Sequence, residues 1–337
     1  MTLQTCPVDT AIWIITGVCN LNCLHCYAYR WRGRRELSLE EKMRLVREFS
    51  ECEIEYVNIS GGEPLLHPHT RQVLEGLREA GIETSIVTNG TMINDEWSRL
   101  LAKLEVFVFV SLDGPKDVHE MQRGPGTYDR VIKGIERLKK HGVPYALVMA
   151  VSKLNWRYTS EFVELAVKLG AERPILIPVM PFGRALENRI YVSTWEYNRA
   201  VINAARKARE LGVKLQLWCS PFAFMTVPPV NHDDIVVSYC RLAPVVDIDP
   251  QGNVLLCDVM DIVLGSVRGK PLREVIEMVE RHPLVGEVFE PKGLPEACKK
   301  CPYVKLCRGG CFTRALVLRG SLNAGDPLCP RVALHAR

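Results

Sequence analysis

Between Ala11 and Gln216 the sequence alternates short β-branched or aromatic runs with longer amphipathic segments rich in charge. This alternation is typical of repeated strand–helix units that build a parallel sheet. Six runs predict strands, at residues 11–16, 55–60, 83–88, 105–110, 145–151 and 174–179. Six units are fewer than the eight of a complete barrel, so the pattern predicts an α/β fold with a partial (β/α)6 barrel.

The alternation stops after Trp218, where a proline-rich stretch, SPFAFMTVPPVNHDD, begins. Beyond this stretch the density of cysteines rises sharply. Proline clusters between patterned segments mark connections rather than helices or strands. We therefore expect two domains: a barrel over residues 1–218 and a small cysteine-rich domain over residues 219–337.

The composition is that of an ordinary globular protein, with 337 residues of which 47% are apolar and 24% charged. No run approaches the ~18 apolar residues of a membrane span, and the start lacks a signal peptide pattern, which favours a cytoplasmic protein. The net charge is only +4, so we expect neither a nucleic-acid partner nor a membrane anchor. The 13 cysteines are too many for a reducing cytosol unless they hold metal, and their odd number fits poorly with disulfides.

Three cysteines follow the first predicted strand in Cys-x3-Cys-x2-Cys spacing: Cys19, Cys23 and Cys26. Four thiolates are the rule for a [4Fe-4S] cluster held by protein alone, so three would leave one iron open to a substrate or cofactor. The alternative is a zinc site completed by His25, although ligands this close on a tight loop would be strained around tetrahedral zinc.

Short polar segments follow four of the other predicted strands. They are Gly61–Pro64 (GGEP), Thr88–Gly90 (TNG), Ser111–Pro115 (SLDGP) and Pro181–Ala185 (PFGRA). Each alone is an ordinary turn signal. Together they indicate an active site, because a parallel barrel assembles its active site from the loops at the carboxyl ends of its strands.

On these motifs the chain resembles radical S-adenosylmethionine (SAM) enzymes, whose fold is a partial TIM-like barrel. The resemblance implies that SAM chelates the open iron and that GGEP lines its amino group. In the sulfatase-maturing branch a serine and an arginine bind the SAM carboxylate, and the matching positions here are Ser111 and Arg123. The residues that the resemblance places at the SAM site are Gly61, Gly62, Glu63, Pro64, Thr88, Asn89, Ser111, Asp113 and Arg123.

The remaining cysteine pattern resembles the SPASM extension of that family, which carries two auxiliary [4Fe-4S] clusters and would bring the total to three. The resemblance assigns an inner cluster to Cys240, Cys257 and Cys311. It assigns an outer cluster to Cys298, Cys301, Cys307 and Cys329. The alternative is a zinc ribbon formed by Cys298, Cys301, Cys307 and Cys311, which leaves the other three cysteines unexplained.

The inner cluster is one ligand short by this assignment. Sulfatase maturases have an eighth cysteine just upstream of the position of Cys240, whereas Asp234 stands there in this chain. An open iron, Asp234 or Cys219 could complete the site. Cys6 and Cys52 fit neither pattern and are expected to be structural thiols.

Asp258 follows Cys257 directly, where the sulfatase-maturing branch has its proton-accepting aspartate. A carboxylate beside an anionic cluster should have a raised pKa, which suits a general base. The alternative is that Asp258 only caps a hairpin turn. The two histidines of the segment His67-Pro-His69 are expected to lie at the solvated start of a helix and receive no role.

The resemblance implies reductive cleavage of SAM to a 5′-deoxyadenosyl radical that abstracts hydrogen from a substrate. The leading hypothesis is a peptide- or protein-modifying oxidoreductase that oxidises or crosslinks its substrate, as do sulfatase-maturing, pyrroloquinoline quinone and RiPP peptide maturases. The alternatives are modification of a tetrapyrrole of the haem pathway or of a metal-cofactor precursor, and a non-catalytic zinc or electron-transfer protein. An external one-electron reductant such as ferredoxin or flavodoxin is expected as partner. The basic flank Arg30, Arg32, Arg34 and Arg35 could steer an acidic leader peptide.

Overall fold

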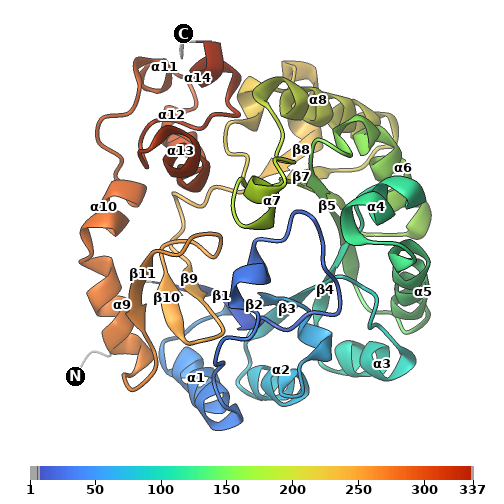
Figure 1. Cartoon of the computed structure of the whole chain (residues 1–337), viewed down its shortest axis with the longest axis vertical. Helices are drawn as coiled ribbons and strands as arrows, with labels where there is room; N and C mark the ends of the chain where they lie inside the picture. The colour runs from blue at the N-terminus through green and yellow to red at the C-terminus, as the bar shows by residue number, and fades with distance from the viewer. Residues whose placement is uncertain (1–5, 7, 335–337) are drawn as a thin grey trace.

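The computed structural model describes residue 6 and residues 8–334, which contain a sheet of eleven strands. The strands are β1 (Thr10–Thr16), β2 (Tyr56–Gly61), β3 (Glu83–Thr88), β4 (Phe107–Ser111), β5 (Tyr145–Val151), β6 (Pro174–Pro178), β7 (Leu215–Leu217), β8 (Ile235–Val237), β9 (Val246–Ile248), β10 (Asn253–Leu255) and β11 (Val263–Ser266). Their order is β11-β10-β9-β1-β2-β3-β4-β5-β6-β7-β8, which leaves the sheet open at β8 and β11. Neighbours from β1 to β8 are parallel, and the sheet curves into an incomplete barrel (Figure 1).

The predicted partial barrel of parallel strands is confirmed, and the six predicted strands correspond to β1 to β6 within two residues at each end. The parallel set continues past these six with β7 and β8, which are only three residues long. So short a run shows no periodicity in the sequence, and only pairing with a neighbouring strand reveals it.

Helices alternate with the strands and cover the outside of the barrel (Figure 1). Those of the barrel are α1 (Leu39–Glu51), α2 (Thr70–Glu79), α3 (Asp95–Lys103), α4 (Lys116–Arg123), α5 (Thr127–Lys140), α6 (Thr159–Leu169), α7 (Arg184–Glu187) and α8 (Thr194–Glu210). Those nearer the C-terminus are α9 (Leu272–Glu280), α10 (Pro283–Phe289), α11 (Glu296–Lys299), α12 (Val304–Cys307), α13 (Phe312–Arg319) and α14 (Pro330–Leu334). Short 3-10 turns are η1 (Ala28–Trp31), η2 (Pro64–Leu66), η3 (Trp156–Tyr158), η4 (Ala223–Met225) and η5 (Pro229–Asp234).

Helix α1 shows why such a segment folds this way. Ser38 accepts the backbone N–H of Glu41, and the Glu41 side chain accepts the N–H of Ser38, so a capping box satisfies the free donors at the start of the helix. Leu45 and Phe49 lie four residues apart and are both buried, so they present one apolar face to the sheet.

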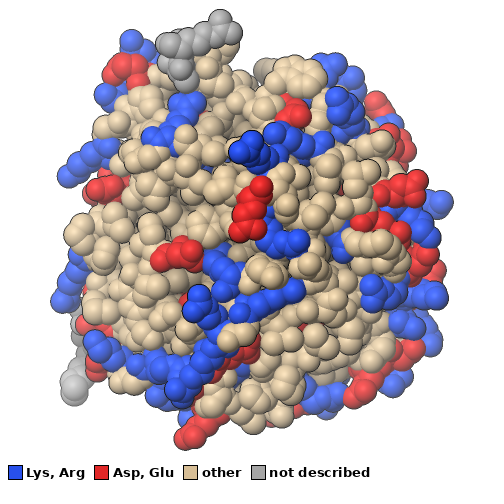
Figure 2. Space-filling view, viewed as in Figure 1, with Lys and Arg blue, Asp and Glu red and all other residues tan. Residues whose placement is uncertain are grey.

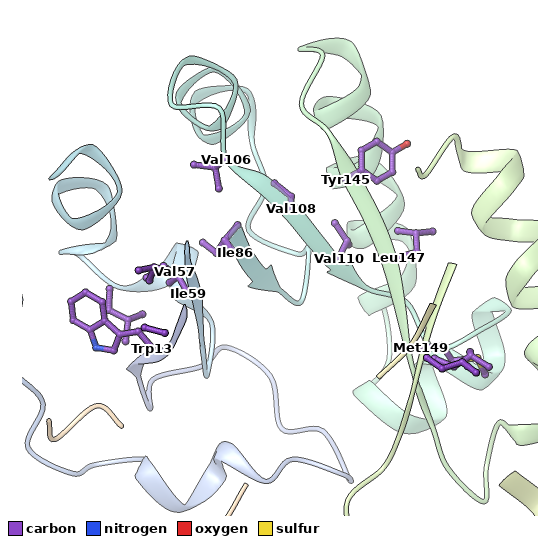
Figure 3. Packing of buried hydrophobic residues seen from close by; sticks show 14 of the residues in the cluster. Trp13, Val57, Ile59, Ile86, Val106, Val108, Val110, Tyr145, Leu147 and Met149 are labelled. Atoms are coloured by element: carbon purple, nitrogen blue, oxygen red, sulfur yellow. The ribbon is translucent and has the colours of Figure 1, made fainter. Parts of the chain in front are cut away.

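The main core lies between the strands and the surrounding helices. Residues spaced by two, such as Val108 and Val110, point to the same side of the sheet and are fully buried, as is Ile86 on the next strand (Figure 3). Trp13 of β1 meets Phe49 of α1 edge to face, with ring centroids 5.7 Å apart. These contacts fix the strands, and therefore the loops that leave their carboxyl ends.

The cysteine-rich region is built onto the first strand of the barrel. Strand β9 pairs in parallel with β1, and β9, β10 and β11 continue as an antiparallel meander. The division of the chain at residue 218 stays a prediction, and β8 lies on the C-terminal side of it. None of the helices in the described part of the chain is long and apolar enough to cross a membrane.

Candidate active site and cysteine clusters

The loop that carries Cys19, Cys23 and Cys26 leaves the carboxyl end of β1, and we term residues 17–27 the cluster loop. Its first residue has to be glycine, because a Cβ on Gly17 would lie 2.4 Å from the carbonyl oxygen of Trp31. The GGEP, TNG, SLDGP and PFGRA segments follow β2, β3, β4 and β6 at the same rim. The sequence-based placement of all five segments at one rim therefore agrees with the strand directions.

A buried polar network holds the start of the cluster loop. The Oε1 atom of Glu36 accepts the Thr16 hydroxyl and the Gly17 N–H, each at 2.8 Å. The His67 Nε2 atom lies 3.1 Å from both Glu36 Oε2 and Lys42 Nζ. The expectation that His67 is solvated is wrong: it is 8% exposed, because Glu36 and Lys42 offer it polar partners inside the fold. Burial lowers the pKa of Lys42 to about 8, and Glu36 opposes that shift.

Arg184, in the PFGRA segment, holds the loop from the other side. Its Nη1 atom donates to the Asn22 carbonyl at 2.7 Å and to the Cys23 carbonyl at 2.9 Å. The Leu24 N–H donates to the carbonyl of Gln122 in α4. The backbone between the cysteines is therefore held by groups from two other parts of the chain, α4 and α7.

The GGEP and TNG segments meet around a buried carboxyl group. A Cβ on Gly62 would lie 2.2 Å from the Val18 carbonyl oxygen, so glycine is what lets GGEP approach the cluster loop. Glu63 is fully buried and accepts the Thr88 hydroxyl at 2.7 Å and the Asn89 N–H at 2.8 Å. Burial raises the pKa of Glu63 to about 7, and those two hydrogen bonds limit the rise. A buried carboxyl group of this kind is suited to a cationic ligand.

Asn89 connects this carboxyl group to the cysteines. Its side-chain N–H₂ donates to Asn20 Oδ1 at 2.9 Å and lies 3.9 Å from the Cys19 sulfur. Pro64, the last residue of GGEP, is buried and begins the turn η2. The predicted SAM-site residues of these two segments are thus brought together next to the cluster loop.

The SLDGP segment and α4 contribute a buried ion pair. Arg123 Nε donates to Asp113 Oδ2 at 2.6 Å, and the Ala150 N–H donates to Asp113 Oδ1 at 2.8 Å. Burial alone would lower the pKa of Arg123, but Asp113, and next the Cys23 thiolate, raise it above its usual value. Asp113 thus fixes the guanidinium near the cluster loop, and carboxylate binding by Arg123 stays a prediction. Ser111 ends β4 on the same rim and is half-buried.

Two of the three cysteines assigned to the inner cluster, Cys257 and Cys311, share a small apolar core, whereas Cys240 is exposed. Cys311 is buried with Met180 and Val259, and Cys257 packs against them. Burial raises the pKa of the Cys257 thiol, and the carboxylates of Asp258 and Asp247 raise it further.

The cysteines assigned to the outer cluster line one hollow. The thiol-bearing residues in its wall are Cys298, Cys301, Cys307 and Cys329. Phe222 and Val332 make the rest of the wall largely apolar. The four cysteines that the resemblance assigns to one cluster therefore face one site.

The ligand spacing argues against zinc at either predicted alternative. Ligands around one zinc ion, at about 2.3 Å from the metal for sulfur, lie within ~4 Å of one another. Across the part of the chain that the structure describes, three such atoms fall within 4.8 Å only in the group Asp247, Cys257 and Asp258. Among the described residues, neither the cluster loop with His25 nor the zinc-ribbon quartet has that spacing.

Asp258 joins the cluster loop to the inner cysteines rather than merely capping a turn. The Tyr27 hydroxyl donates to Asp258 Oδ2 at 2.7 Å, and the Asp258 N–H donates to Asp247 Oδ2 at 3.0 Å. Asp247 Oδ1 is buried and has no hydrogen-bond partner among the described residues. Burial, and next Asp258, raise the pKa of Asp247 well above its usual value. Sequence reasoning missed Tyr27 and Asp247, although Tyr27 directly follows Cys26.

The expected basic flank is only partly available to a partner. Arg30 donates to the Asp258 carbonyl at 2.6 Å and pairs with Asp261 at 2.7 Å, and Arg32 donates to the Leu21 carbonyl. Arg34 and Arg35 remain exposed. Figure 2 shows basic side chains gathered near the middle of the face that carries the cluster loop.

Comparison with known proteins shows what the chain is similar to. Residues 13–166 match the family model of the radical SAM superfamily. The AdoMet-dependent heme synthase of Methanosarcina barkeri (strain Fusaro / DSM 804) is 28% identical over 341 residues, which cover 94% of this chain and 95% of that protein. The mycofactocin maturase MftC of Mycolicibacterium smegmatis is 28% identical over 327 residues, which cover 94% of this chain and 81% of that protein. The structure of Streptococcus suis SuiB bound to precursor peptide SuiA has a TM-score of 0.77 at 17% identity and covers 96% of this chain and 76% of that one, so the fold is shared.

Proposed function

We propose that this chain, an enzyme with a radical SAM domain, abstracts a hydrogen atom from a peptide or protein. The substrate is left oxidised or crosslinked. The proposal rests on one observation: a loop with three cysteines and the buried Glu63 lie next to each other at the same rim of the barrel. A maturase and a peptide-bound SuiB among the similar proteins support the choice of substrate class.

The cluster loop would hold a [4Fe-4S] cluster through Cys19, Cys23 and Cys26, and the three thiols fit a cluster that keeps one iron free for SAM. When bound, the cluster supplies the electron that cleaves SAM into methionine and a 5′-deoxyadenosyl radical. Glu63 attracts the SAM ammonium group, and Arg123, held by Asp113, presents a planar guanidinium to the SAM carboxylate. Both groups are buried, so water does not compete for these contacts.

The cysteine-rich region would hold two auxiliary clusters, which is supported by the hollow that the outer four cysteines share and by the packing of Cys257 against Cys311. Cys298, Cys301, Cys307 and Cys329 supply four thiolates for the outer cluster, the number usual for a closed one. Cys240, Cys257 and Cys311 supply three for the inner cluster. External electrons would come from a one-electron donor such as ferredoxin or flavodoxin.

Asp258 is placed to accept the proton that a substrate loses on oxidation. Its Oδ2 atom holds the Tyr27 hydroxyl, so the carboxylate is oriented while its other oxygen lies beside Cys257. Proton transfer to a positioned group of this kind typically contributes about 10²–10⁴-fold to a rate.

The test is to prepare the enzyme anaerobically, supply SAM and a strong reductant, and measure 5′-deoxyadenosine together with the mass of candidate precursor peptides. We expect 5′-deoxyadenosine from the parent enzyme, none from Cys23→Ala, and normal amounts from Cys52→Ala, which removes a thiol outside all the predicted ligand sets. A peptide that loses hydrogen mass supports the substrate class. Absence of 5′-deoxyadenosine from iron-loaded parent enzyme would refute radical SAM chemistry altogether.

A tetrapyrrole of the haem pathway is the second candidate substrate, favoured by the near full-length similarity to the Methanosarcina barkeri heme synthase. Titration of the enzyme with an iron porphyrin distinguishes the two candidates. A shift of the porphyrin Soret band with saturation at one equivalent, together with porphyrin-dependent 5′-deoxyadenosine formation, would replace the peptide with the tetrapyrrole. No shift at saturating porphyrin would remove this candidate.

A further inference from the structure

Two cysteines leave the same end of two neighbouring parallel strands. Cys219 comes two residues after the end of β7, and Cys240 comes three residues after the end of β8. The register pairs Leu217 with Val237, so the two strands end side by side. Because paired strands lie about 4.8 Å apart, both thiols start from one small area of the rim.

Asp234 lies at the opposite end of the same strands. It immediately precedes β8, whose first residue, Ile235, pairs with Leu215. A three-residue strand is about 10 Å long, so Asp234 and Cys240 lie at opposite ends of β8. Its carboxylate accepts the side-chain N–H₂ of Asn231 at 3.2 Å, within its own turn η5. The topology therefore removes Asp234 as a ligand beside Cys240.

Cys219 is tied to Cys311 through a buried ion pair. Arg314 donates to the Cys219 carbonyl oxygen and, from Nη2, to Asp326 Oδ2 at 2.6 Å. The same Asp326 oxygen accepts the Cys311 N–H at 2.9 Å. Arg314 and Asp326 are at most 1% exposed. A two-residue bridge thus fixes the backbones of Cys219 and Cys311 relative to each other.

The backbone of Cys219 is itself unusual. Its φ is +52°, in the left-handed region that residues other than glycine avoid. Such conformations persist where the surrounding structure enforces them, and they concentrate at functional sites. The carbonyl oxygen of this left-handed residue accepts a hydrogen bond from the buried Arg314, which holds the turn after β7 in place.

Cys311 also lies beside Cys257, because both pack in one apolar cluster with Met180 and Val259. Cys311 therefore connects Cys257 to Cys219 through the bridge of Arg314 and Asp326.

We propose that Cys219 is the fourth thiolate of the inner cluster, completing the set Cys240, Cys257 and Cys311. This fourth ligand lies in the barrel, just after β7, whereas the other three ligands lie between β8 and the C-terminus. The inference rests on the inner cluster of the proposed function. It makes that cluster fully thiolate-ligated, with no open iron to bind substrate.

The test starts from the full chain with Cys19, Cys23 and Cys26 changed to Ala, so that only the auxiliary clusters remain. We expect about eight irons per chain in this parent, four for each of two [4Fe-4S] clusters. Adding Cys219→Ala should lower the iron content and give, in the oxidised protein, the EPR signal of a cluster that has lost one iron. Adding Asp234→Ala, or Cys52→Ala as the matched thiol control, should leave both readouts unchanged.

The outcomes separate the inference from the proposed function. A Cys219→Ala protein that keeps about eight irons and shows no new EPR signal overturns the inference. A parent with only about four irons removes the inner cluster itself, whatever Cys219 does. If Cys219→Ala fails to fold, as judged by loss of the outer cluster as well, Cys219→Ser replaces it. The serine variant should change the Mössbauer spectrum of one iron site, and a spectrum identical to the parent would count against the inference.

Discussion

Glu63 is a buried carboxyl group whose pKa, at about 7, lies in the range where its charge changes at working pH. Only the ionised form attracts the SAM ammonium group, so SAM affinity in the parent should rise between about pH 6 and pH 8. Glu63→Gln should bind SAM about 10-fold or more weakly and lose this rise, because a charged hydrogen bond is typically worth about 1.5–3 kcal/mol.

Equilibrium binding of SAM across that pH range measures the effect of Glu63. Glu79→Gln is the matched control, since Glu79 is exposed on α2. An affinity that falls with rising pH in the parent, or a Glu63→Gln protein with unchanged affinity, would contradict the assignment of Glu63.

Asp258 is expected to act after SAM cleavage. Asp258→Asn should therefore keep 5′-deoxyadenosine formation but lower the yield of modified substrate by about 10²-fold or more. Tyr27→Phe removes the hydroxyl that donates to Asp258 and should have a smaller effect in the same direction. Product mass and 5′-deoxyadenosine, measured in one assay, separate the two steps. Equal loss of both products would mean that Asp258 only supports the fold of the site.

Helix α7 supports the cluster loop, because Arg184 at its start donates hydrogen bonds to the backbone of that loop. Arg184→Ala removes hydrogen bonds to the Asn22 and Cys23 carbonyls, each worth about 1 kcal/mol. We expect the variant to lose iron from the loop several times faster in the presence of a chelator, with little change in thermal stability. Arg189→Ala is the control, because Arg189 follows the same helix and is exposed. Equal rates of iron loss in the two variants would show that Arg184 does not support the loop.

How far the sequence predicts these elements depends on their length and on their partners. The long strands β1 to β6 were predicted correctly, since five to seven residues with β-branched, aromatic and other apolar side chains between helical segments give a clear pattern. β7 and β8 were missed because a strand of three residues is too short to show a pattern in the sequence. His67 was misjudged because the polar groups that bury it, Lys42 and Glu36, come from elsewhere in the chain.

The candidate site shows the same limit. The cysteine spacing predicts groups of ligands, and the outer four do line one hollow. The spacing alone could not choose between Asp234 and Cys219, because that choice depends on which end of the sheet each residue occupies.

For the molecule as a whole, β1 is the strand on which both parts of the chain depend, since it pairs with β2 on one side and β9 on the other. Trp13→Ala removes the largest side chain buried in β1 and should lower the free energy of unfolding by about 3–5 kcal/mol. Denaturant unfolding measures this, with Trp195→Ala as control because Trp195 is 65% exposed. We expect fluorescence and cluster absorbance to change in one transition, and separate transitions would show that the two parts unfold independently.

The pairing of β9 with β1 has a consequence for engineering. The cysteine-rich region could be exchanged between relatives to give one barrel the electron-transfer properties of another. Such an exchange would replace β9, which pairs with β1, the strand that leads into the loop with Cys19. A working chimaera has to carry β1 and its loop together with the transplanted part. For such grafts, the boundaries should be chosen from the strand pairs of the sheet and not from a single residue number.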